Sequence, residues 1–477
     1  MWSTASVELD KMKVEQIYTN CLAEAAYYIE SNGEVAIVDP LREVQQYVDM
    51  AERNGAKIKY IFETHFHADF VSGHLDLANS TGAEIVFGPS AETGFDATIA
   101  EDGQEFSIGD ATLKVLHTPG HTLESSTYLL KDPAGKDYCI FTGDTLFIGD
   151  VGRPDLAIKS ELTQEDLAGM LYDSLRNKIL PLADDVIVYP AHGAGSACGK
   201  NMSSETYATL GDQKKNNYAL QDISKEDFIL ELTTGIMPPP AYFPKAALLN
   251  KNGYGNINEV VSSGTTRLSP QEALDHQRIG ALILDTRSKE EFHKGFIKDS
   301  IFIGIDGGFA PWVGTVLLDH KQPIVILSEP GREEEVATRL ARVGFDNSIG
   351  YIDGGYQAWK DSGLETDLIQ SLSAEEVKRL SESAEINLID SRKPSEFESK
   401  RAKIAKNNPL DFIHDQLDRY NKDETYYVHC RSGYRSLIYT SILKKNGIND
   451  VVDVDGGFVA MENTEMEMLD FSCSAGN

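Results

Sequence analysis

Short apolar runs that end in polar loops shape the first half of the chain. The run at 59–62 predicts a buried strand, and the polar segment that begins at Thr64 follows it directly. Three later apolar runs also end just before a histidine or an aspartate, namely His121, Asp144 and His192. Side chains that follow several strand ends can converge on one cation. The pattern therefore predicts a binding site built from loops at the ends of strands.

The second half of the chain contains an internal repeat. The matching pairs are 283–287 with 388–392, Ser269 with Ser373, and 353–356 with 455–458, at offsets between 102 and 105 residues. A period this long indicates two tandem domains, because the repeats of a solenoid run to about 20–50 residues. Both serines are predicted to cap the start of a helix. Each copy alternates short apolar strands with helical stretches, which predicts a small α/β domain with a parallel sheet.

The segment Thr64–Phe70 carries the residue types that bind metals. His65, His67 and Asp69 stand at alternate positions along it. A lone His-x-His pair is a weak signal, but this segment together with the later strand-end residues, in this order, is a strong one. The alternative is that the histidines only satisfy buried hydrogen bonds, and the completeness of the set argues against it.

The order and spacing of these residues resemble the metallo-β-lactamase superfamily, over roughly the first half of the chain. Most hydrolases of that superfamily hold two zinc ions, and their motif carries a histidine directly after the aspartate. Here that position is Phe70, which cannot bind a metal. The resemblance therefore implies a centre with one metal ion.

Within the superfamily the pattern resembles the persulfide dioxygenases, which implies an αββα sandwich and one Fe(II) ion per chain. The implied iron ligands are His65, His121 and Asp144, a set that suits non-haem Fe(II) and oxygen chemistry. The residues expected close beside the metal are His67, Asp69 and His192. The implied reaction oxidises a low-molecular-weight persulfide with O2 to sulfite and a thiol.

A second chemical centre is predicted around Cys430. This cysteine ends an apolar strand, and a loop with a glycine leads from it to a helix expected to begin near Ser436. Loop amides, the helix N-terminus and two arginines favour a thiolate and bind an anion. The loop resembles the rhodanese active site, which implies sulfur transfer with thiosulfate or sulfite, whereas a Cys-x5-Arg phosphatase loop is one residue longer. The predicted substrate-binding residues are Arg431, Ser432, Gly433, Tyr434 and Arg435.

The first repeat lacks this chemistry. Alignment without gaps places Ser328 opposite Cys430, and it places Glu329 and Glu333 opposite the two arginines. A hydroxyl group cannot carry a persulfide, and two carboxylates repel an anionic donor. We therefore expect an inactive rhodanese-like domain with a role in spacing, docking or oligomer contact.

The expected domains are a metal-binding domain at 1–260, an inactive rhodanese-like domain at 261–368 and an active one at 369–477. The proline-rich segment 237–244 predicts an extended strap along the metal domain, with a plain exposed linker as the alternative.

Two further residues lie in loops near the predicted metal ligands. Cys198 follows His192 in a glycine-rich loop. It either meets the persulfide substrate, as the resemblance suggests, or is simply a small residue that fits the loop. Arg153 either pairs with Asp155 or holds a substrate carboxylate.

Composition narrows the set of partners. The net charge of −31 and the pI near 4.7 argue against nucleic acid or an anionic membrane surface as partner, because both would repel the chain. No apolar run is long enough to span a bilayer, and the N-terminus lacks the features of a secretory signal. Five scattered cysteines do not form a disulfide framework, so we expect a cytoplasmic protein, and we expect a homo-oligomer.

The predicted function is an iron-dependent persulfide dioxygenase fused to a sulfurtransferase. Two alternatives belong to other classes. One is a zinc thioester hydrolase resembling glyoxalase II with a fused sulfurtransferase, in which a metal-bound hydroxide is the nucleophile. The other is a sulfur carrier or sensor without catalysis. The thiol that carries the persulfide stays open between glutathione, coenzyme A and other thiols.

Overall fold

The structure is a computed structural model that describes residues 3–9, 12–156 and 162–470. The chain divides into two compact units. The first comprises residues 1–257 with 341–344, and the second comprises residues 258–340 with 345–477. The first unit contains the predicted metal ligands, and the second contains both repeats apart from residues 341–344.

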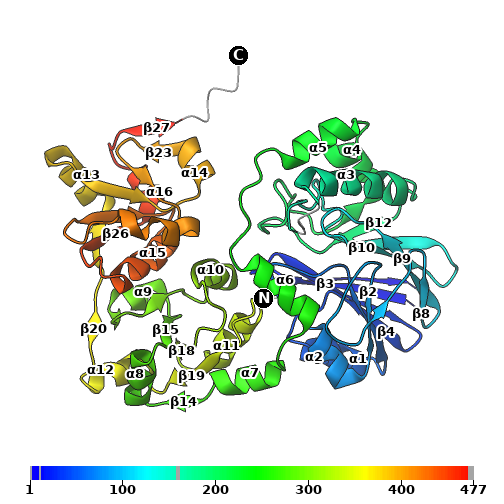
Figure 1. Cartoon of the computed structure of the whole chain (residues 1–477), viewed down its shortest axis with the longest axis horizontal. Coiled ribbons are helices and arrows are strands. Elements are labelled where there is room, and N and C mark those ends of the chain that lie inside the picture. Colours follow the sequence, from blue (N-terminus) through cyan, green and yellow to red (C-terminus); the bar gives the residue numbers. More distant parts are fainter. Residues whose placement is uncertain (1–2, 10–11, 157–161, 471–477) are drawn as a thin grey trace. The chain divides into compact units, whose positions relative to one another are not determined.

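The first unit is built on two sheets (Figure 1). The strands of the seven-stranded sheet lie in the order β1 (Ser3–Leu9), β2 (Met12–Thr19), β3 (Glu24–Ser31), β4 (Glu34–Val38), β5 (Lys57–Glu63), β6 (Glu84–Phe87) and β7 (Thr98–Ile99). The strands of the six-stranded sheet lie in the order β13 (Ala208–Thr209), β12 (Ile187–Pro190), β11 (Asp137–Gly143), β10 (Ser126–Lys131), β9 (Ala111–His117) and β8 (Glu105–Ile108). Pairing is parallel from β4 to β7 and between β11 and β12, and antiparallel elsewhere.

Helices cover the outer face of each sheet (Figure 1). Those on the first sheet are α1 (Gln45–Arg53) and α2 (His74–Thr81). Those on the second are α3 (Gln164–Ser174), η1 (Leu175–Ile179), α4 (Leu210–Asn216), η2 (Tyr218–Leu220) and α5 (Lys225–Thr233). The two inner sheet faces share a buried core that includes Tyr27, Phe62 and Phe141. The αββα sandwich expected from the resemblance is therefore confirmed.

The segment 237–244 packs along the metal domain, as predicted. Arg153 donates a 2.5 Å hydrogen bond to the Met237 carbonyl, and the Tyr242 hydroxyl donates a 3.1 Å bond to the carbonyl of Asp69. One detail differs from the prediction, because Pro244 lies in the first turn of α6 (Phe243–Asn252) instead of in an extended segment. Proline is tolerated there because the first amides of a helix have no partner within it.

The second unit contains two parallel five-stranded sheets of the same topology. The first has the order β14 (Arg267–Leu268), β19 (Ser348–Ile352), β18 (Ile324–Leu327), β15 (Leu282–Asp285) and β17 (Ile301–Phe302). The second has the order β21 (Gln370–Ser373), β26 (Val451–Asp455), β25 (Tyr426–His429), β22 (Asn387–Asp390) and β24 (Lys406–Asn407). Two short pairs complete the strands, β16 (Phe296–Ile297) with β20 (Thr366–Asp367) and β23 (Lys400–Ala402) with β27 (Met468–Asp470). The repeated sheets agree with the repeat seen in the sequence.

Helices alternate with the strands in both repeats. The first repeat contains α8 (Pro270–Arg278), α9 (Lys289–His293), α10 (Phe309–Val316), α11 (Glu333–Ala341) and α12 (Gly355–Asp361), preceded by α7 (Ile257–Gly264). The second contains α13 (Ala374–Ser383), α14 (Pro394–Ser399), η3 (Leu410–Arg419), α15 (Tyr434–Lys445) and α16 (Gly457–Met461). Ser269 and Ser373 cap α8 and α13 as predicted. The helix expected near Ser436 begins earlier, at Tyr434, because Gly433 takes a left-handed φ of 97° and turns the loop into it.

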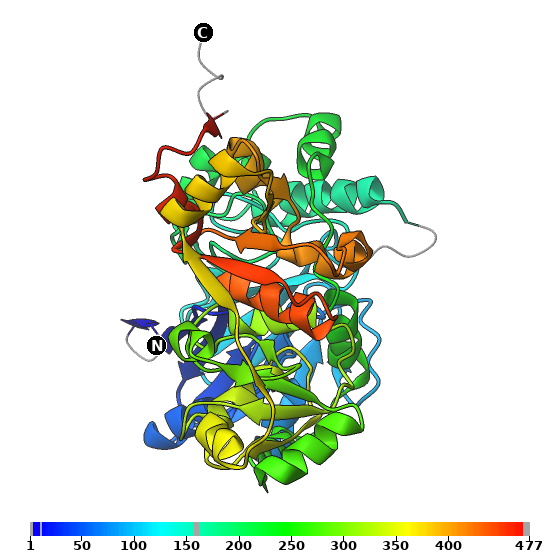
Figure 2. The ribbon, with the colours of Figure 1, turned by 90° about the vertical axis from the view of Figure 1, so that its left-hand side faces the viewer.

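The two repeats of the second unit pack against each other. Figure 2 shows the second repeat, in orange and red, next to the green and yellow first repeat. The Phe302 amide donates a 3.1 Å hydrogen bond to the Ser441 hydroxyl on α15, and the ring of His414 is 2.7 Å from the Val316 carbonyl. No helix in the described ranges combines the length and the apolar character that crossing a membrane requires.

Candidate functional site

The structure brings His65, His121 and Asp144 together in loops that follow β5, β9 and β11. All three are buried, and one potential ligand atom from each lies within 4.8 Å of the others. The His121 Nε2 atom is 3.3 Å from Asp144 Oδ2, and the His65 Nε2 atom is 3.9 Å from the same oxygen. Among the described residues Asp144 Oδ2 is buried without a hydrogen-bond partner, as expected of an atom reserved for a cation. These residues fit a metal ion.

Hydrogen bonds at the far side of each ring orient the two histidines. His121 Nδ1 is 2.8 Å from the Arg153 carbonyl, which can only accept a hydrogen bond. His65 Nδ1 is 3.0 Å from the Thr64 hydroxyl, which itself donates to Asp39. Both Nδ1 atoms must therefore carry the proton, and both Nε2 lone pairs face Asp144. This is the arrangement that outer groups impose on metal-binding histidines.

Burial and neighbouring charges prepare His65 and Asp144 for a cation. Burial, reinforced by the nearby His67, holds the pKa of His65 well below its usual range, so this ring is neutral at neutral pH. Burial alone would raise the pKa of Asp144, but the nearby imidazoles of His192, His121 and His65 outweigh burial and lower it. A neutral imidazole and an ionised carboxylate are the forms that bind metals.

His192 joins Asp144 to Asp69 and completes a second set of close groups. Its Nδ1 atom is 2.7 Å from Asp144 Oδ1, and its Nε2 atom is 2.8 Å from Asp69 Oδ2. Burial tends to lower the pKa of His192, yet the two carboxylates outweigh burial and raise it well above the usual value. The ring is therefore held as a cation between two anions. Asp144 thus offers one oxygen to the metal set and uses the other to hold His192.

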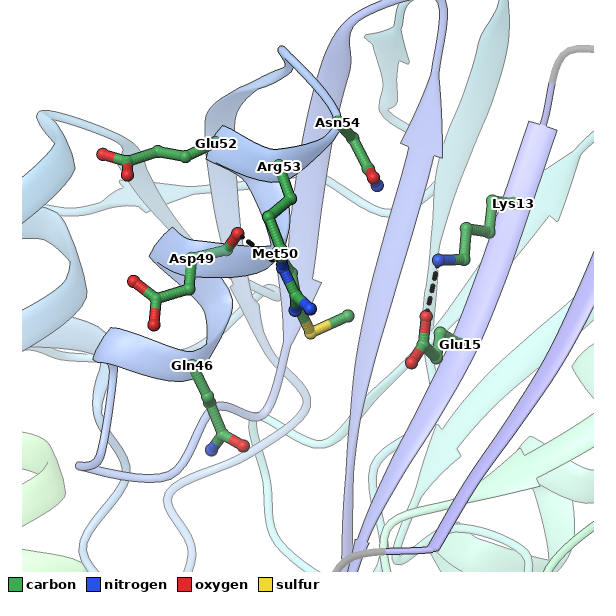
Figure 3. A pocket seen from close by; sticks show the side chains of 8 residues that line it. All are labelled: Lys13, Glu15, Gln46, Asp49, Met50, Glu52, Arg53 and Asn54. Atoms are coloured by element: carbon green, nitrogen blue, oxygen red, sulfur yellow. Dashed lines mark hydrogen bonds and ion pairs between the residues drawn. The ribbon is translucent and has the colours of Figure 1, made fainter.

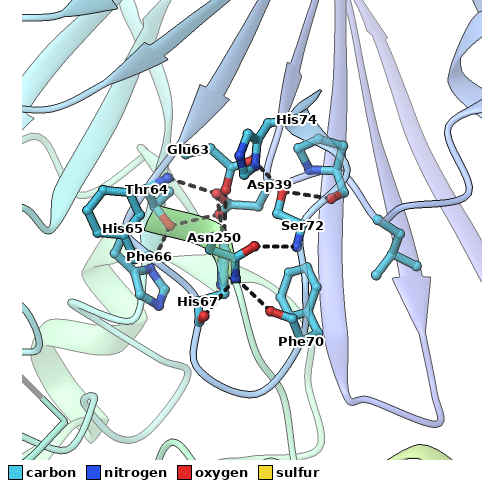
Figure 4. A network of polar contacts seen from close by, with 12 residues as sticks. Asp39, Glu63, Thr64, His65, Phe66, His67, Phe70, Ser72, His74 and Asn250 are labelled. Carbon is cyan, nitrogen blue, oxygen red and sulfur yellow. Dashed lines mark hydrogen bonds and ion pairs between the residues drawn. The ribbon is translucent and has the colours of Figure 1, made fainter. Parts of the chain in front are cut away.

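The ring of His67 lies beside that of His65, with the ring centroids 4.2 Å apart, and its Nε2 atom faces Asp39 (Figure 4). Its Nε2 atom is 3.1 Å from Asp39 and 3.6 Å from Glu63, and its ring centroid is 4.4 Å from that of Phe70. Phe70 is fully buried, so it fills the space beside the motif with an apolar ring. His67 also lies close to Asp69 and His192, because one potential ligand atom from each of the three lies within 4.8 Å of the others, so the structure brings the three predicted neighbours of the metal together.

A buried polar network supports the motif loop, and sequence reasoning missed its members (Figure 4). Asp39 accepts hydrogen bonds from the Thr64 amide and hydroxyl, both at 2.8 Å. Glu63 accepts a hydrogen bond from Ser72, and it lies 3.4 Å from His74. The network residues absent from the sequence prediction are Asp39, Glu63, Ser72, His74 and Asn250. Asp39 follows the apolar run of β4, so the strand-end signal that located the metal ligands would also have found it.

Asn250 of α6 makes a testable contribution to this loop. Its side-chain amide donates to the carbonyls of His67 and Phe70 at 2.7 and 2.8 Å, and its oxygen accepts from the Ser72 amide at 2.9 Å. Asn250→Ala leaves three buried backbone groups unpaired, so we expect the free energy of unfolding to fall by about 2–4 kcal/mol. We also expect weaker metal retention, because the ligand loop loses its support.

Chemical denaturation and metal analysis after dialysis check this prediction. The control is Asn54→Ala, which removes an exposed amide from the same unit and should change stability by less than about 0.5 kcal/mol. Equal stability of the two variants would contradict the role given to Asn250.

Cys198 lies beside the metal set. Its sulfur belongs to a buried group with Asp144 and His192 whose potential ligand atoms lie within 4.8 Å of one another. Burial, with the charges of Asp69 and Asp144, raises the pKa of this thiol well above its usual value. Arg153 holds the loop, because its amide donates to the Cys198 carbonyl at 3.0 Å and its side chain pairs with Asp155 at 2.6 Å. Of the two roles considered for Arg153, the structure favours the structural one.

In the second unit, hydrogen bonds from backbone amides hold the Cys430 loop in place. The Gly433 amide donates a 3.1 Å hydrogen bond to the Cys430 sulfur, and the Cys430 carbonyl accepts from the Phe458 amide at 2.7 Å. Arg431 and Ser432 are exposed. Arg435 instead forms a bidentate ion pair with Glu396, at 2.6 and 2.9 Å. The loop thus directs an amide at the thiol, but one of its two cations is already engaged.

In the matching loop of the first repeat, the loop amide has a carboxylate as its acceptor, whereas in the second repeat it has a thiol. The Gly331 amide donates to Glu333 at 3.1 Å, which is the distance between the Gly433 amide and the Cys430 sulfur. Arg332 pairs with Asp306 through two hydrogen bonds of 2.8 and 2.9 Å. The loop amide that would face a thiol in this repeat is therefore already hydrogen-bonded to another side chain of the protein.

The hydrogen bond between the Gly331 amide and Glu333 leads to a prediction for the variant Ser328→Cys. We expect no persulfide at position 328 after incubation with thiosulfate. The Gly331 amide is already hydrogen-bonded to Glu333, and the carboxylates of Glu329 and Glu333 each repel the thiosulfate dianion by about 1–3 kcal/mol. Mass spectrometry should find the added mass of about 32 Da on the Cys430 peptide alone. A persulfide on the new cysteine would contradict the assignment of one inactive repeat.

A surface cavity of about 800 Å³ in the first unit is lined by none of the predicted site residues (Figure 3). Its lining side chains are mostly polar and come from β2, from α1 and from the residue that follows α1: Lys13, Glu15, Gln46, Asp49, Met50, Glu52, Arg53 and Asn54. Lys13 pairs with Glu15 at 2.7 Å. Ligand sites are usually lined mainly by apolar groups, so we assign no function to this cavity.

Two family descriptions match the chain. The description "Metallo-beta-lactamase superfamily" matches residues 19–192, and "Rhodanese-like domain" matches residues 269–362 and 373–464. The chain therefore belongs to the metallo-β-lactamase superfamily and carries two rhodanese-like domains. The fusion architecture expected from the sequence is confirmed.

Individual relatives differ in their reactions. A crystal structure of a metallo-β-lactamase from Staphylococcus aureus is 31% identical, with a TM-score of 0.65, and the match covers 72% of this chain and 99% of that one. A mitochondrial persulfide dioxygenase of Bos taurus is 29% identical over 209 residues, which are 43% of this chain and 74% of the relative. A probable hydroxyacylglutathione hydrolase of Schizosaccharomyces pombe is 29% identical over 206 residues, which are 38% of this chain and 75% of the relative. Other relatives are matched over only 57–65% of their length.

These similarities define an enzyme of the metallo-β-lactamase family with rhodanese-like domains. A dioxygenase and a hydrolase are equally similar to the chain at 29% identity, so similarity alone does not choose between the two reactions. The choice depends on the metal-binding residues of this chain.

Proposed function

We propose that the chain is an iron-dependent persulfide dioxygenase coupled to a sulfurtransferase. The observation that carries the proposal is the buried set of His65, His121 and Asp144, next to a motif in which Phe70 takes the place of a ligand. Two imidazoles and one carboxylate with open positions suit non-haem Fe(II) in enzymes that use O2.

The surroundings of this set support one metal ion instead of two. A second ion would need Asp69 and His192, and these two residues form an ion pair with each other at 2.8 Å. His67 is directed to Asp39 and Glu63, and Phe70 offers no lone pair. His67, Asp69 and His192 do lie close enough together to be considered as a second set, but the motif of a two-zinc hydrolase carries a histidine where this chain has Phe70, so this set has one ligand fewer than that motif.

The proposed oxidation balances as R–S–SH + O2 + H2O giving R–SH, sulfite and two protons. Bound Fe(II) supplies open coordination positions and the electrons that activate O2. The chain's residues orient the reactants and limit water, because every ligand is buried. Cys198 lies beside Asp144, where it can contact a persulfide held near the metal.

The proposed sulfur transfer takes place at Cys430. Its thiolate attacks the outer sulfur of thiosulfate, the S–S bond breaks, and sulfite leaves with the bonding electron pair. The resulting Cys430 persulfide is then attacked by a small thiol, which leaves as R–S–SH and regenerates the cysteine. Covalent catalysis divides one difficult transfer into two easier steps. The product R–S–SH is the substrate of the proposed oxidation.

The first test of the proposal is metal content. We expect about one iron ion per chain in protein purified without added metal, with oxygen uptake on a small persulfide. Two zinc ions per chain with thioester hydrolysis would favour the hydrolase alternative, which the hydroxyacylglutathione hydrolase relatives suggest. Phe70→His should permit binding of a second ion without being needed for oxygen uptake.

The remaining predictions about the protein's setting follow from the sequence alone. A cytoplasmic location, a homo-oligomeric state and the absence of nucleic-acid or membrane partners stay predictions. The carrier or sensor alternative predicts no turnover at all, so measurable oxygen uptake that is lost with the metal would exclude it.

A further inference from the structure

The Cys430 loop has less available positive charge than its sequence suggests. The Arg435 guanidinium is half-buried and pairs with both oxygens of Glu396. Burial tends to raise the pKa of Glu396, but Arg435 outweighs burial and holds it below the usual range. The carboxylate is therefore charged and neutralises this arginine. Another cation beside the loop would restore the missing positive charge.

A lysine from the first repeat supplies such a cation. The Lys289 ammonium on α9 donates a 3.4 Å hydrogen bond to the Ser432 carbonyl in the Cys430 loop. A Cβ atom placed on Gly433 would lie 4.0 Å from the same nitrogen. The nearest carboxylate, Glu290, is 3.9 Å from the ammonium, which makes for a weak pair.

Peptide geometry connects this ammonium to the thiol. The Ser432–Gly433 peptide is trans, so its carbonyl and its N–H point in opposite directions. The carbonyl faces Lys289, and the N–H donates to the Cys430 sulfur at 3.1 Å. A cation at the carbonyl end favours the orientation in which the positive end of the peptide dipole faces the sulfur. Lys289 therefore acts on the thiol through this peptide group and lies at the end of the peptide opposite to the Cys430 sulfur.

Other contacts fix α9 and its repeat against the loop. His293, one helical turn after Lys289, lies 3.4 Å from the buried carboxylate of Asp453. The Tyr434 hydroxyl donates a 2.7 Å hydrogen bond to the Gly304 carbonyl. A Cβ atom on Gly307 would come within 2.2 Å of the Tyr434 ring, so the ring fits closely against this glycine. The lysine is therefore held in register with the loop.

We propose that Lys289 of the cysteine-less repeat is a positioning residue of the Cys430 sulfur-transfer site. It orients the Ser432–Gly433 peptide and stabilises the negative charge on the sulfur. The proposal rests on the sulfur transfer proposed above, and it gives the inactive repeat a defined part in the chemistry of its neighbour.

The test compares Lys289→Ala, Lys289→Arg and a matched control in the full chain. The control is Lys294→Ala, which removes the same charge from an exposed lysine next to the same helix. For Lys289→Ala we expect kcat with thiosulfate and a thiol to fall about 3- to 10-fold, while KM for thiosulfate changes less than about 2-fold. Lys289→Arg should recover most of the rate, and the control should match the unaltered protein.

A KM increase at unchanged kcat would overturn the proposal, because it would mean that Lys289 attracts the donor instead of supporting the thiolate. Equal rates for Lys289→Ala and Lys294→Ala would also overturn it.

Alkylation separates this proposal from the proposed function. Reaction of Cys430 with iodoacetamide at pH 7 needs a thiolate but no sulfur donor. We expect Lys289→Ala to slow this alkylation about 3- to 10-fold and Lys289→Arg to restore it. If the unaltered protein transfers no sulfur but shows this difference, the proposed activity fails and the role of Lys289 stands. If Cys430 is alkylated at the same rate in all variants, the proposed role of Lys289 is contradicted, whether or not the protein transfers sulfur.

Discussion

Asp144→Ala should remove both the metal and oxygen uptake while sulfur transfer continues. Asp144 supplies the only carboxylate of the predicted ligand set, and it also holds His192 at 2.7 Å. Its loss leaves two imidazoles, which retain Fe(II) poorly, so we expect oxygen uptake on a persulfide to fall by at least about 100-fold. Metal analysis and an oxygen electrode measure both effects. Thiosulfate-dependent sulfur transfer should stay within about 2-fold of the unaltered protein, because Cys430 lies in the other compact unit.

The matched control for this experiment is Asp185→Ala. Asp185 is an exposed aspartate of the same unit, where it pairs with Lys136 at 2.6 Å, and its loss should leave both activities unchanged. Loss of both activities in a folded Asp144→Ala protein would show that the two centres are not independent. Full oxygen uptake without metal would remove the basis of the dioxygenase proposal.

Cys430→Ser should eliminate sulfur transfer, by at least about 1000-fold, and leave the metal centre intact. A hydroxyl group is neither ionised nor able to accept sulfur at neutral pH, so the first chemical step cannot occur. Iron content and oxygen uptake on a preformed small persulfide should be unchanged. Mass spectrometry after incubation with thiosulfate should no longer find the added sulfur of about 32 Da on this loop.

The same variant tests the coupling of the two reactions. Thiosulfate with a small thiol should support oxygen uptake in the unaltered protein and should stop supporting it in Cys430→Ser. Retained sulfur transfer in this variant would contradict the assignment of Cys430. Continued oxygen uptake from thiosulfate would mean that the persulfide forms elsewhere.

Features set by short stretches of sequence were predictable. Ser269 and Ser373 cap their helices because a serine side chain reaches the amide only three residues ahead. The strand ends before His65, His121 and Asp144 were visible because apolar runs stop there. The sandwich itself came from the resemblance carried by these motifs, since strand pairing between distant segments leaves little local trace.

Contacts between distant segments were not predictable. Asn250 supports the motif loop from about 180 positions away, and nothing near it marks that role. The pairing of Arg435 with Glu396 joins the starts of two helices across 39 positions. From the sequence, Arg435 was expected to be available to an anionic substrate. The charge of a side chain does not reveal which partner it contacts in the folded protein, so the ion pair with Glu396 was not foreseen.

The carboxylate of Glu333 in the inactive repeat has a consequence for the choice of knockout variants. A repeat that lacks the cysteine also lacks the sulfur that accepts a hydrogen bond from the loop amide. In the first repeat the Glu333 carboxylate is the acceptor for this amide, which belongs to Gly331. The active repeat has Arg435 at the matching position, so no substitute acceptor stands there. Cys430→Ala would leave the Gly433 amide unpaired and disturb the loop, whereas Cys430→Ser keeps an acceptor in place. Serine is therefore the substitution that separates lost chemistry from lost structure.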